Sequence, residues 1–227
     1  MMQSEHERRA YLRAMGIDVW VPRDQVDAES APVEPETQTG PGEQGWDALR
    51  ASVAACTRCT LHQARTQTVF GVGNPNADWM IIGEAPGAEE DRRGEPFVGR
   101  AGRLLDEMLL AVGQSRDSVF IANILKCRPP NNRDPSQEEA ASCRPYLERQ
   151  IALVQPGIIL AVGRIAAQQL LRTDAPVGRL RGKVHQLDAI PLVVTYHPAY
   201  LLRSPSQKRK SWDDLCTAAG IMAEGAA

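Results

Sequence analysis

The sequence predicts an α/β fold in which a mostly parallel sheet lies between helices. Short apolar segments typical of buried strands alternate along the chain with segments whose apolar residues recur at helical spacing. Strands and helices that alternate in this way usually form parallel strands joined by helical connections. The sequence contains no internal repeat.

Five strands are expected, each from a short apolar segment. The first stops at Gly83, and the second ends where a loop rich in Pro and Asn begins. The segment 69–76 contains two Gly and one Pro, and is expected to be a loop. The expected strands are residues 79–82, 119–124, 157–162, 183–187 and 192–196.

Five helices are expected from apolar spacing and from capping signals. Apolar residues between 46 and 53 predict an amphipathic helix that runs into Cys56. Ser136 and Glu139 form a capping box, which opens a helix that continues to about residue 153. The remaining helices are expected at residues 101–112, 164–171 and 212–223.

Length and composition fit one folded domain that carries an N-terminal tail. The chain has 227 residues, of which 43% are hydrophobic and 24% charged. Residues 1–23 form a short segment that either docks onto a protein partner or folds back onto the domain. Residues 24–45 are acidic and rich in Pro and Gly, with almost nothing to bury, so we expect a disordered linker. The folded domain is expected at residues 46–227.

The sequence lacks the signals of membrane insertion and secretion. No apolar run reaches the roughly 18 residues that span a bilayer, and the opening residues MMQSEHERRAY contain no apolar segment like that of a secretion signal. We therefore expect a cytoplasmic protein with no membrane partner. Five cysteines in such a chain favour metal or cluster ligation over structural disulfides.

Charge is unevenly distributed along the chain, although the net charge is only −2. The first 45 residues hold four Arg against nine Asp and Glu, whereas residues 164–210 hold nine Lys and Arg against two Asp. The basic stretch either follows a phosphate backbone or forms an ordinary solvated surface.

Residues 81–102, with the sequence IIGEAPGAEEDRRGEPFVGRAG, have the composition of a binding loop. The segment starts as a strand, continues as an acidic loop with Gly and Pro, and ends at the start of a helix. Ligands of open α/β sheets bind at the carboxyl ends of strands, where Gly lets the backbone approach them closely. The loop is therefore either a ligand site or a turn with solvated acidic residues.

Four cysteines are spaced like metal ligands. Cys56 and Cys59 form a CxxC pair, and Cys127 and Cys143 follow as two single positions. Zinc sites more often use two short CxxC knuckles, so this spacing suits an iron–sulfur cluster better without excluding zinc. Cys216 lies near apolar residues in the last expected helix, where we expect a core thiol.

Several motifs together resemble those of the family 4 uracil-DNA glycosylases. They are GEAPG at 83–87, EPFVG at 95–99, IANILKCRPP at 121–130 and HPAYLLR at 197–203. The resemblance runs from about Cys56 to Arg203 and does not include residues 1–45. It implies the uracil-DNA glycosylase fold, a three-layer α/β/α sandwich with a mostly parallel four-stranded central sheet. It also implies a [4Fe–4S] cluster bound by Cys56, Cys59, Cys127 and Cys143.

The resemblance implies a monofunctional DNA glycosylase of base excision repair. Such an enzyme flips uracil out of DNA, hydrolyses its N-glycosidic bond and leaves an abasic site. We therefore expect uracil-containing DNA as the partner and a monomer as the active form. A related group that traps uracil-DNA covalently carries an inserted Lys-Arg-Arg-Ile-His stretch, which is absent from this sequence, so we expect turnover.

Asn123 and Phe97 are expected to recognise the base. The Asn123 amide can accept a hydrogen bond from uracil N3–H and donate one to O4, whereas cytosine offers the reverse pattern. A buried polar mismatch of this kind discriminates by a factor on the order of 10⁴. Phe97, one of three Phe in the chain, lies in a polar loop and is expected to stack on uracil. Without the family, Asn123 would be a strand-end cap and Phe97 a hydrophobic anchor of its loop.

His197 is expected to stabilise the leaving group, because it follows an apolar strand and precedes Pro198. A hydrogen-bond donor aimed at uracil O2 would stabilise the negative charge that bond cleavage leaves on the base, and either a neutral or a protonated imidazole could supply it. The segment 199–206 resembles the superfamily loop that enters the minor groove. Leu201, Leu202 and Arg203 are candidates for the wedge that fills the space left by the flipped base, and Lys208, Arg209 and Lys210 are expected to contact phosphate groups.

Glu84 is the candidate for positioning water or for supporting an oxocarbenium-like sugar. Other uracil-DNA glycosylases place an Asp in this motif, where this chain has Ala85. The exclusion of thymine is assigned to the Glu89–Glu90 segment. The first motif is expected to line the uracil pocket with Glu84, Ala85, Pro86 and Gly87.

Two other functions fit parts of the pattern. A non-catalytic iron–sulfur protein that recognises uracil, single strands or damaged DNA would use the same pocket for binding alone. A redox or flavodoxin-like protein fits the α/β pattern but explains neither Asn123 nor the HPAYLLR segment. The presence of both Asn123 and His197 favours the enzyme.

Overall fold

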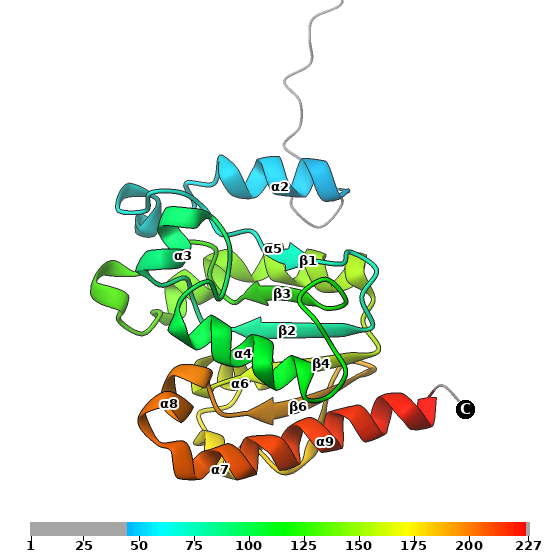
Figure 1. Cartoon of the computed structure of the whole chain (residues 1–227). Helices are drawn as coiled ribbons and strands as arrows, with labels where there is room; N and C mark the ends of the chain where they lie inside the picture. The colour runs from blue at the N-terminus through cyan, green and yellow to red at the C-terminus, as the bar shows by residue number, and fades with distance from the viewer. Residues whose placement is uncertain (1–44, 226–227) are drawn as a thin grey trace, which may run out of the picture. The chain divides into compact units, whose positions relative to one another are not determined.

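The computed structural model describes residues 45–225 (Figure 1). The predictions for the segment 1–23 and for the linker up to residue 44 lie outside these residues. The domain begins with helix α2 (Trp46–Ala54), as its apolar spacing predicts.

A six-stranded sheet forms the middle layer, in the order β1–β3–β2–β4–β6–β5. The four central strands run parallel, and β1 and β5 add an antiparallel strand at each edge. The predicted mostly parallel sheet is therefore confirmed, as the centre of a wider sheet. The strands are β1 (Val72–Gly73), β2 (Trp79–Gly83), β3 (Phe120–Asn123), β4 (Ile158–Val162), β5 (Val184–Leu187) and β6 (Ile190–Thr195).

Strand β1 lies in a segment whose composition predicts a loop, so that prediction is wrong. Gly73 has φ +112°, and a Cβ there would lie 1.9 Å from the carbonyl oxygen of Val119. Glycine lets the backbone pass this close to β3. A strand of two residues shows no alternation of apolar and polar side chains, which is why the sequence does not reveal it.

Helices cover both faces of the sheet, which confirms the predicted sandwich (Figure 1). In β2 the side chains alternate, with Met80 and Ile82 in one hydrophobic cluster and Trp79 and Ile81 in the other. The first cluster packs against α2, α5 (Gln137–Val154) and α6 (Arg164–Leu171). The second packs against α4 (Arg100–Leu110), α8 (Pro198–Arg203) and α9 (Lys208–Gly225).

Local signals explain where several helices begin. Ser136 accepts a hydrogen bond from the backbone of Glu139, whose side chain accepts one from the Ser136 backbone N–H, so the predicted capping box of α5 is confirmed. Three short helices lie outside the predicted set: α3 (Ala88–Arg93), α7 (Val177–Leu180) and α8. The loop expected at 199–206 is instead α8 followed by a 3₁₀ turn (Pro205–Gln207). Pro198 occupies the first turn of α8, where its fixed φ favours a helix.

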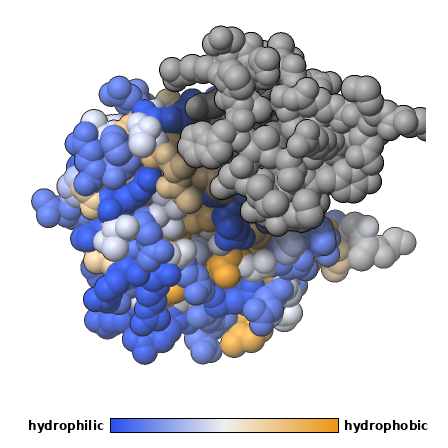
Figure 2. All heavy atoms as spheres, turned by 90° about the horizontal axis from the view of Figure 1, so that it is seen from above, coloured by the Kyte–Doolittle hydropathy of each residue, from blue (hydrophilic) through white to orange (hydrophobic). Residues whose placement is uncertain are grey.

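Cys216 is exposed, so the expected core thiol is a wrong prediction. Helix α9 turns Leu215 and Ala218 toward the sheet, which leaves Cys216 on the solvent side. Within residues 45–225, no helix has the length and apolarity to cross a membrane. Hydrophilic residues dominate the coloured surface in Figure 2, where hydrophobic residues are scattered.

Candidate active site

The carboxyl ends of the parallel strands border a pocket of about 860 Å³. The register of β2 and β3 pairs Gly83 with Asn123, and that of β4 and β6 pairs Val162 with Thr195. The segments that follow these strands therefore converge at one edge of the sheet. They bring together all the predicted pocket residues, which are Glu84, Ala85, Pro86, Gly87, Phe97, Asn123 and His197.

Asn123 presents an unpaired acceptor to this pocket. The residue is 2% exposed, and its side-chain oxygen has no hydrogen-bond partner in the described part of the chain. A buried acceptor without a partner carries a desolvation cost of about 1–3 kcal/mol. Such a group is expected to meet a donor from a ligand.

Gly83 lets the Asn123 amide and the Phe97 ring approach each other closely. A Cβ at Gly83 would lie 2.4 Å from Asn123 Oδ1 and 2.6 Å from Phe97 Cζ. The Phe97 ring packs in the cluster that contains Ile81, and it also stacks with the His197 ring at a centroid distance of 5.6 Å. Phe97 thus anchors its loop and lines the pocket at the same time.

His197 caps the start of α8 and presents its ring to the pocket. Its Nδ1 accepts a hydrogen bond from the Ala199 N–H at 3.1 Å, so the proton of the neutral ring resides on Nε2. Burial and, to a smaller extent, the charge of Arg203 lower the pKa of His197 to about 4, while Glu90 opposes the shift. The imidazole is therefore neutral near pH 7 and carries one donor, Nε2–H.

Glu84 has a pKa close to neutrality. Burial and, to a smaller extent, the charge of Asp134 raise the pKa of Glu84 to about 7, while Arg164 opposes the shift. Asp134 and Arg164 form an ion pair at 2.5 Å beside the pocket. A carboxyl group with this pKa can exchange protons at physiological pH.

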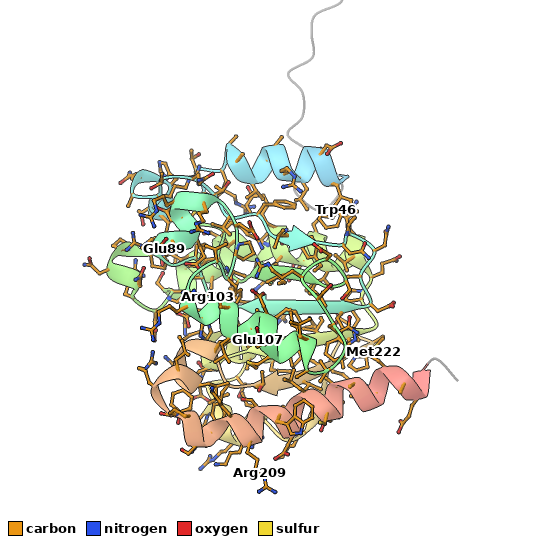
Figure 3. The ribbon with its side chains drawn as sticks, in the orientation of Figure 1. Trp46, Glu89, Arg103, Glu107, Arg209 and Met222 are labelled. Carbon is orange, nitrogen blue, oxygen red and sulfur yellow. The ribbon has the colours of Figure 1, made fainter. Side chains whose placement is uncertain are left out.

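The two glutamates assigned to the exclusion of thymine lie in different places. Glu90 lines the pocket, and its Oε1 accepts hydrogen bonds from the backbone N–H groups of Val98 and Gly99 at 3.0 and 3.3 Å. Glu89 lies on α3 (Figure 3) and is absent from the pocket lining. Its carboxylate forms an ion pair with Arg92. Of the predicted segment, Glu90 therefore borders the pocket, whereas Glu89 on the unpredicted helix α3 does not, and the exclusion of thymine by this segment stays a prediction.

The predicted DNA-contacting residues divide into one buried and five exposed side chains. Leu201 is 1% exposed and packs in a hydrophobic cluster, so its assignment to a DNA wedge is wrong. Leu202 is 37% exposed, and Arg203 is exposed and lines the pocket. Arg209 points away from the domain in Figure 3, and the neighbouring side chains of Lys208 and Lys210 are exposed as well.

Several pocket residues lie outside the set that the sequence predicts. Tyr196 and Tyr200, whose rings lie 5.0 Å apart, line the pocket because α8 brings them together. Arg133 and Arg164 come from the loop before α5 and the start of α6. Gly163 directly follows β4, just as Gly83 ends β2. The tendency of ligands to bind at the carboxyl ends of parallel strands could therefore have identified Gly163.

The four predicted ligand cysteines line one small cavity, and none of them forms a disulfide. The Arg65 guanidinium donates to Cys127 Sγ at 3.1 Å. Burial raises the pKa of Cys127, and that of Cys143 to about 11. Among residues 45–225, no three His, Cys, Asp or Glu side chains are arranged to hold a single metal ion. A four-iron cluster bonds each thiolate through a different iron, so it requires four thiols around one space, and these residues fit that requirement.

Lys126 connects the cysteine cavity with the pocket. It is 1% exposed, and its ammonium group donates to the Asn123 carbonyl oxygen at 2.8 Å and to Gln150 Oε1 at 2.6 Å. Burial lowers the pKa of Lys126 to about 8, although the neighbouring thiols of Cys143 and Cys127 oppose the shift. The backbone of Asn123 is thereby fixed from behind the pocket.

An unpaired amide oxygen, an aromatic ring and a neutral imidazole around one pocket define a site for a flat polar ring such as a nucleobase. The sequence model of the uracil DNA glycosylase superfamily matches residues 70–216. The type-4 uracil-DNA glycosylase of Archaeoglobus fulgidus is 42% identical over 176 residues, which cover 74% of this chain and 88% of the relative. The corresponding protein of Pyrobaculum aerophilum is 43% identical over 175 residues, covering 74% and 89% of the two chains.

A third relative shows a similar degree of identity. The type-4 uracil-DNA glycosylase of Thermotoga maritima is 43% identical over 158 residues, which cover 69% of this chain and 82% of the relative. Within the uracil DNA glycosylase superfamily, this chain therefore belongs to the type-4 family.

Proposed function

We propose that this chain flips uracil out of DNA and hydrolyses its N-glycosidic bond, leaving an abasic site. The observation that carries the proposal is the buried Asn123 oxygen, which faces the pocket without a hydrogen-bond partner in residues 45–225. The names of the type-4 relatives support the same activity.

Asn123 and Phe97 recognise the flipped base in this proposal. Asn123 Oδ1 accepts from uracil N3–H, and the amide nitrogen donates to O4. Cytosine has an acceptor at N3 and a donor at N4, so it would oppose both groups of the amide. The Phe97 ring covers one face of the base, as the closeness of the ring to Gly83 and Asn123 supports.

His197 and Glu84 act on the bond that breaks. Departure of uracil leaves negative charge on its O2, and the Nε2–H of the neutral imidazole donates to that oxygen. The Ala199 N–H keeps Nδ1 as the acceptor, which fixes the proton on the side that faces the base. Glu84 in its ionised form orients the attacking water or stabilises positive charge on the sugar.

The DNA strand is held by exposed residues of α8 and α9. Leu202 fills the space that the flipped nucleotide leaves in the duplex, and the basic side chains contact phosphate groups. The exposure of Leu202 supports its role as the wedge. Leu201 cannot take this role, because its side chain is buried in the core. The phosphate contacts are assigned to Arg203, Lys208, Arg209 and Lys210.

A [4Fe–4S] cluster is the proposed cofactor, bound by Cys56, Cys59, Cys127 and Cys143. When bound, it links the end of α2, the loop after β3 and helix α5 through covalent bonds to iron. Arg65 and Lys126 place positive charge beside the thiolates that bind the iron. Base recognition and hydrolysis remain the task of the pocket side chains.

The proposal extends to the organisation and location of the protein. Residues 46–227 form the glycosylase domain, which acts as a monomer in the cytoplasm. Residues 1–23 either dock onto a protein partner or fold back onto the domain, and residues 24–45 link them to it. The match of the superfamily to residues 70–216 supports the domain assignment.

Uracil release from a labelled oligonucleotide tests the proposal. We expect the iron-loaded protein to release uracil but neither thymine nor cytosine from otherwise identical strands. Binding of the uracil strand without release of the base would contradict the enzyme and support the non-catalytic DNA-binding alternative.

A further inference from the structure

We propose that Arg116, which lies outside the pocket lining, is a positioning residue that holds Phe97 in its base-stacking conformation. The inference rests on the proposed function, since it concerns the ring assigned to stacking on uracil. It adds a residue from a loop that none of the motifs includes.

Phe97 adopts a backbone conformation that a side chain of its size rarely takes. Its φ is +54°, in the left-handed region that favours glycine. Residues in this region persist only where surrounding contacts determine the backbone, and they are frequent at ligand sites. The turn that carries Phe97 therefore needs groups that hold it.

Arg116 holds the carbonyl groups of this turn. Its guanidinium donates to the carbonyl oxygen of Pro96 at 2.7 Å and to that of Phe97 at 3.2 Å. The same group donates to Glu95 Oε1 at 2.9 Å and to Asp106 Oδ1 at 3.0 Å. These four acceptors use the fixed planar arrangement of guanidinium donors, which lysine does not have.

Two further features fix the turn from its other side. Glu90 accepts hydrogen bonds from the N–H groups of Val98 and Gly99. Gly102, in the first turns of α4, leaves room for the Phe97 carbonyl, because a Cβ there would lie 1.7 Å from that oxygen. Glu90 lines the pocket and could touch substrate, whereas Arg116 does not, so Arg116 isolates the positioning effect.

Loss of these bonds frees the backbone of Phe97 to leave its left-handed conformation. The ring then moves from its place beside Gly83, Asn123 and His197, and one face of the bound base loses its cover. Excision therefore falls although no group that touches the substrate has changed. A role in stability alone would leave the activity of the folded protein unchanged.

The test compares kcat/KM for uracil excision by the full-length iron-loaded protein and its variants, well below their unfolding temperatures. We expect R116M to lose about tenfold and F97A about 10- to 100-fold, in line with the energy of stacking one base. R116K should fall between R116M and wild type. D106N, which removes one ion pair and leaves the carbonyl contacts, should stay within about twofold and serves as the matched control.

A double-mutant cycle assigns the effect to the ring. If Arg116 acts through Phe97, R116M causes no further loss in the F97A background. An equal loss in both backgrounds, or full activity of folded R116M, would overturn the inference. Should R116M not fold, R116K in both backgrounds gives the same comparison with a smaller change. Absence of uracil release by wild type would instead contradict the proposed function.

Discussion

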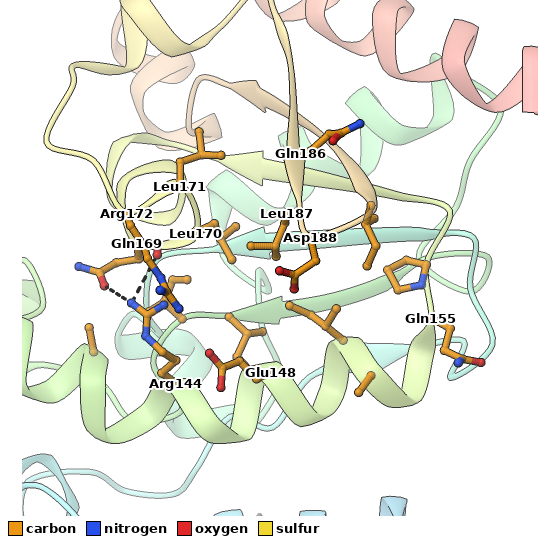
Figure 4. Close-up of a pocket in the computed structure, with 17 residues that line it drawn as sticks. Arg144, Glu148, Gln155, Gln169, Leu170, Leu171, Arg172, Gln186, Leu187 and Asp188 are labelled. Atoms are coloured by element: carbon orange, nitrogen blue, oxygen red, sulfur yellow. Dashed lines mark hydrogen bonds between the residues drawn. The ribbon is translucent and has the colours of Figure 1, made fainter. Parts of the chain in front are cut away.

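Two cavities of about 860 Å³ each lie in different parts of the domain, and their chemistry differs. One is the pocket at the carboxyl edge of the sheet. The other is a groove between α5, α6 and the β5–β6 hairpin, lined by Leu170, Leu171 and Leu187 (Figure 4). In the groove, the Arg144 guanidinium donates hydrogen bonds to the backbone and side-chain oxygens of Gln169.

The difference lies in the state of the polar groups. The pocket holds a buried acceptor without a partner in the described residues, a histidine with a pKa of about 4 and a glutamate with a pKa of about 7. A buried acceptor without a partner and side chains with strongly shifted pKa values lower the stability of the fold. A bound ligand or the catalysed reaction can offset this loss. Equal volume thus does not identify an active site, whereas convergent perturbed groups do.

His197 provides the largest contrast between a pocket residue and a matched residue elsewhere. H197A should lower the rate of uracil release by about 10²–10³, the usual effect of removing one donor to a developing negative charge. H185A is the control, since His185 is also partly buried but contacts the Leu180 carbonyl away from the pocket. Single-turnover excision measures the rate of uracil release by both variants. Similar rates for H197A and H185A would refute the role of His197.

Glu84 should make excision depend on pH near neutrality. The carboxyl is protonated below its pKa of about 7, so the wild-type rate should rise as pH increases through 7. E84Q should lower the rate at pH 8 by about 10² and remove this rise. The difference in excision rate between wild type and E84Q therefore becomes smaller as the pH falls.

The groove supplies the control for Glu84. E148Q should leave both the rate and its pH profile unchanged, because Glu148 lines the groove and not the pocket. A pH profile of E84Q that rises like that of wild type would assign the titration to another group.

Much of the fold followed from local patterns in the sequence. Apolar segments predicted the central strands because both of their faces are covered, and Ser136 with Glu139 predicted the start of α5. Strand β1 and the short helices α3 and α8 are too short to show the apolar periodicity by which strands and helices are recognised in a sequence. Their formation depends on glycine contacts and on packing against the domain.

The site was predictable where a residue directly follows a strand. Asn123 ends β3 and His197 comes just after β6. Because the carboxyl ends of parallel strands lie at one edge of the sheet, both residues are expected there. Tyr200 and Arg116 depend on the path of α8 and of a distant loop, which single-sequence patterns do not contain. Leu201 and Cys216 were misplaced because which helix face meets the core depends on how α8 and α9 dock.

The basic residues at the start of α9 should affect binding more than catalysis. K208A with K210A should weaken binding to a uracil-containing duplex and reduce the slope of log affinity against log salt by about one per charge lost. The rate of saturated enzyme should change little, since neither residue lines the pocket. Fluorescence anisotropy at several salt concentrations measures the slope, and an unchanged slope would remove these residues from the DNA contact.

The smallest effect is expected in the groove itself. R172A should leave uracil excision within about twofold of wild type, because Arg172 lies at the end of α6 and lines the groove and not the pocket. A loss comparable with that of H197A would show that the groove takes part in the reaction and would remove the contrast between the two cavities.

The most direct test of the account is the base preference of N123D. The carboxyl group that this substitution introduces has no N–H to donate to uracil O4, and its ionised form repels that oxygen. Its protonated form donates to cytosine N3 and accepts from the cytosine amino group. We predict that N123D loses at least about 10²-fold in uracil release and gains release of cytosine from the same strand, with thermal unfolding as the check on folding. Undiminished uracil release, with cytosine still refused, would contradict the claim that Asn123 reads the base.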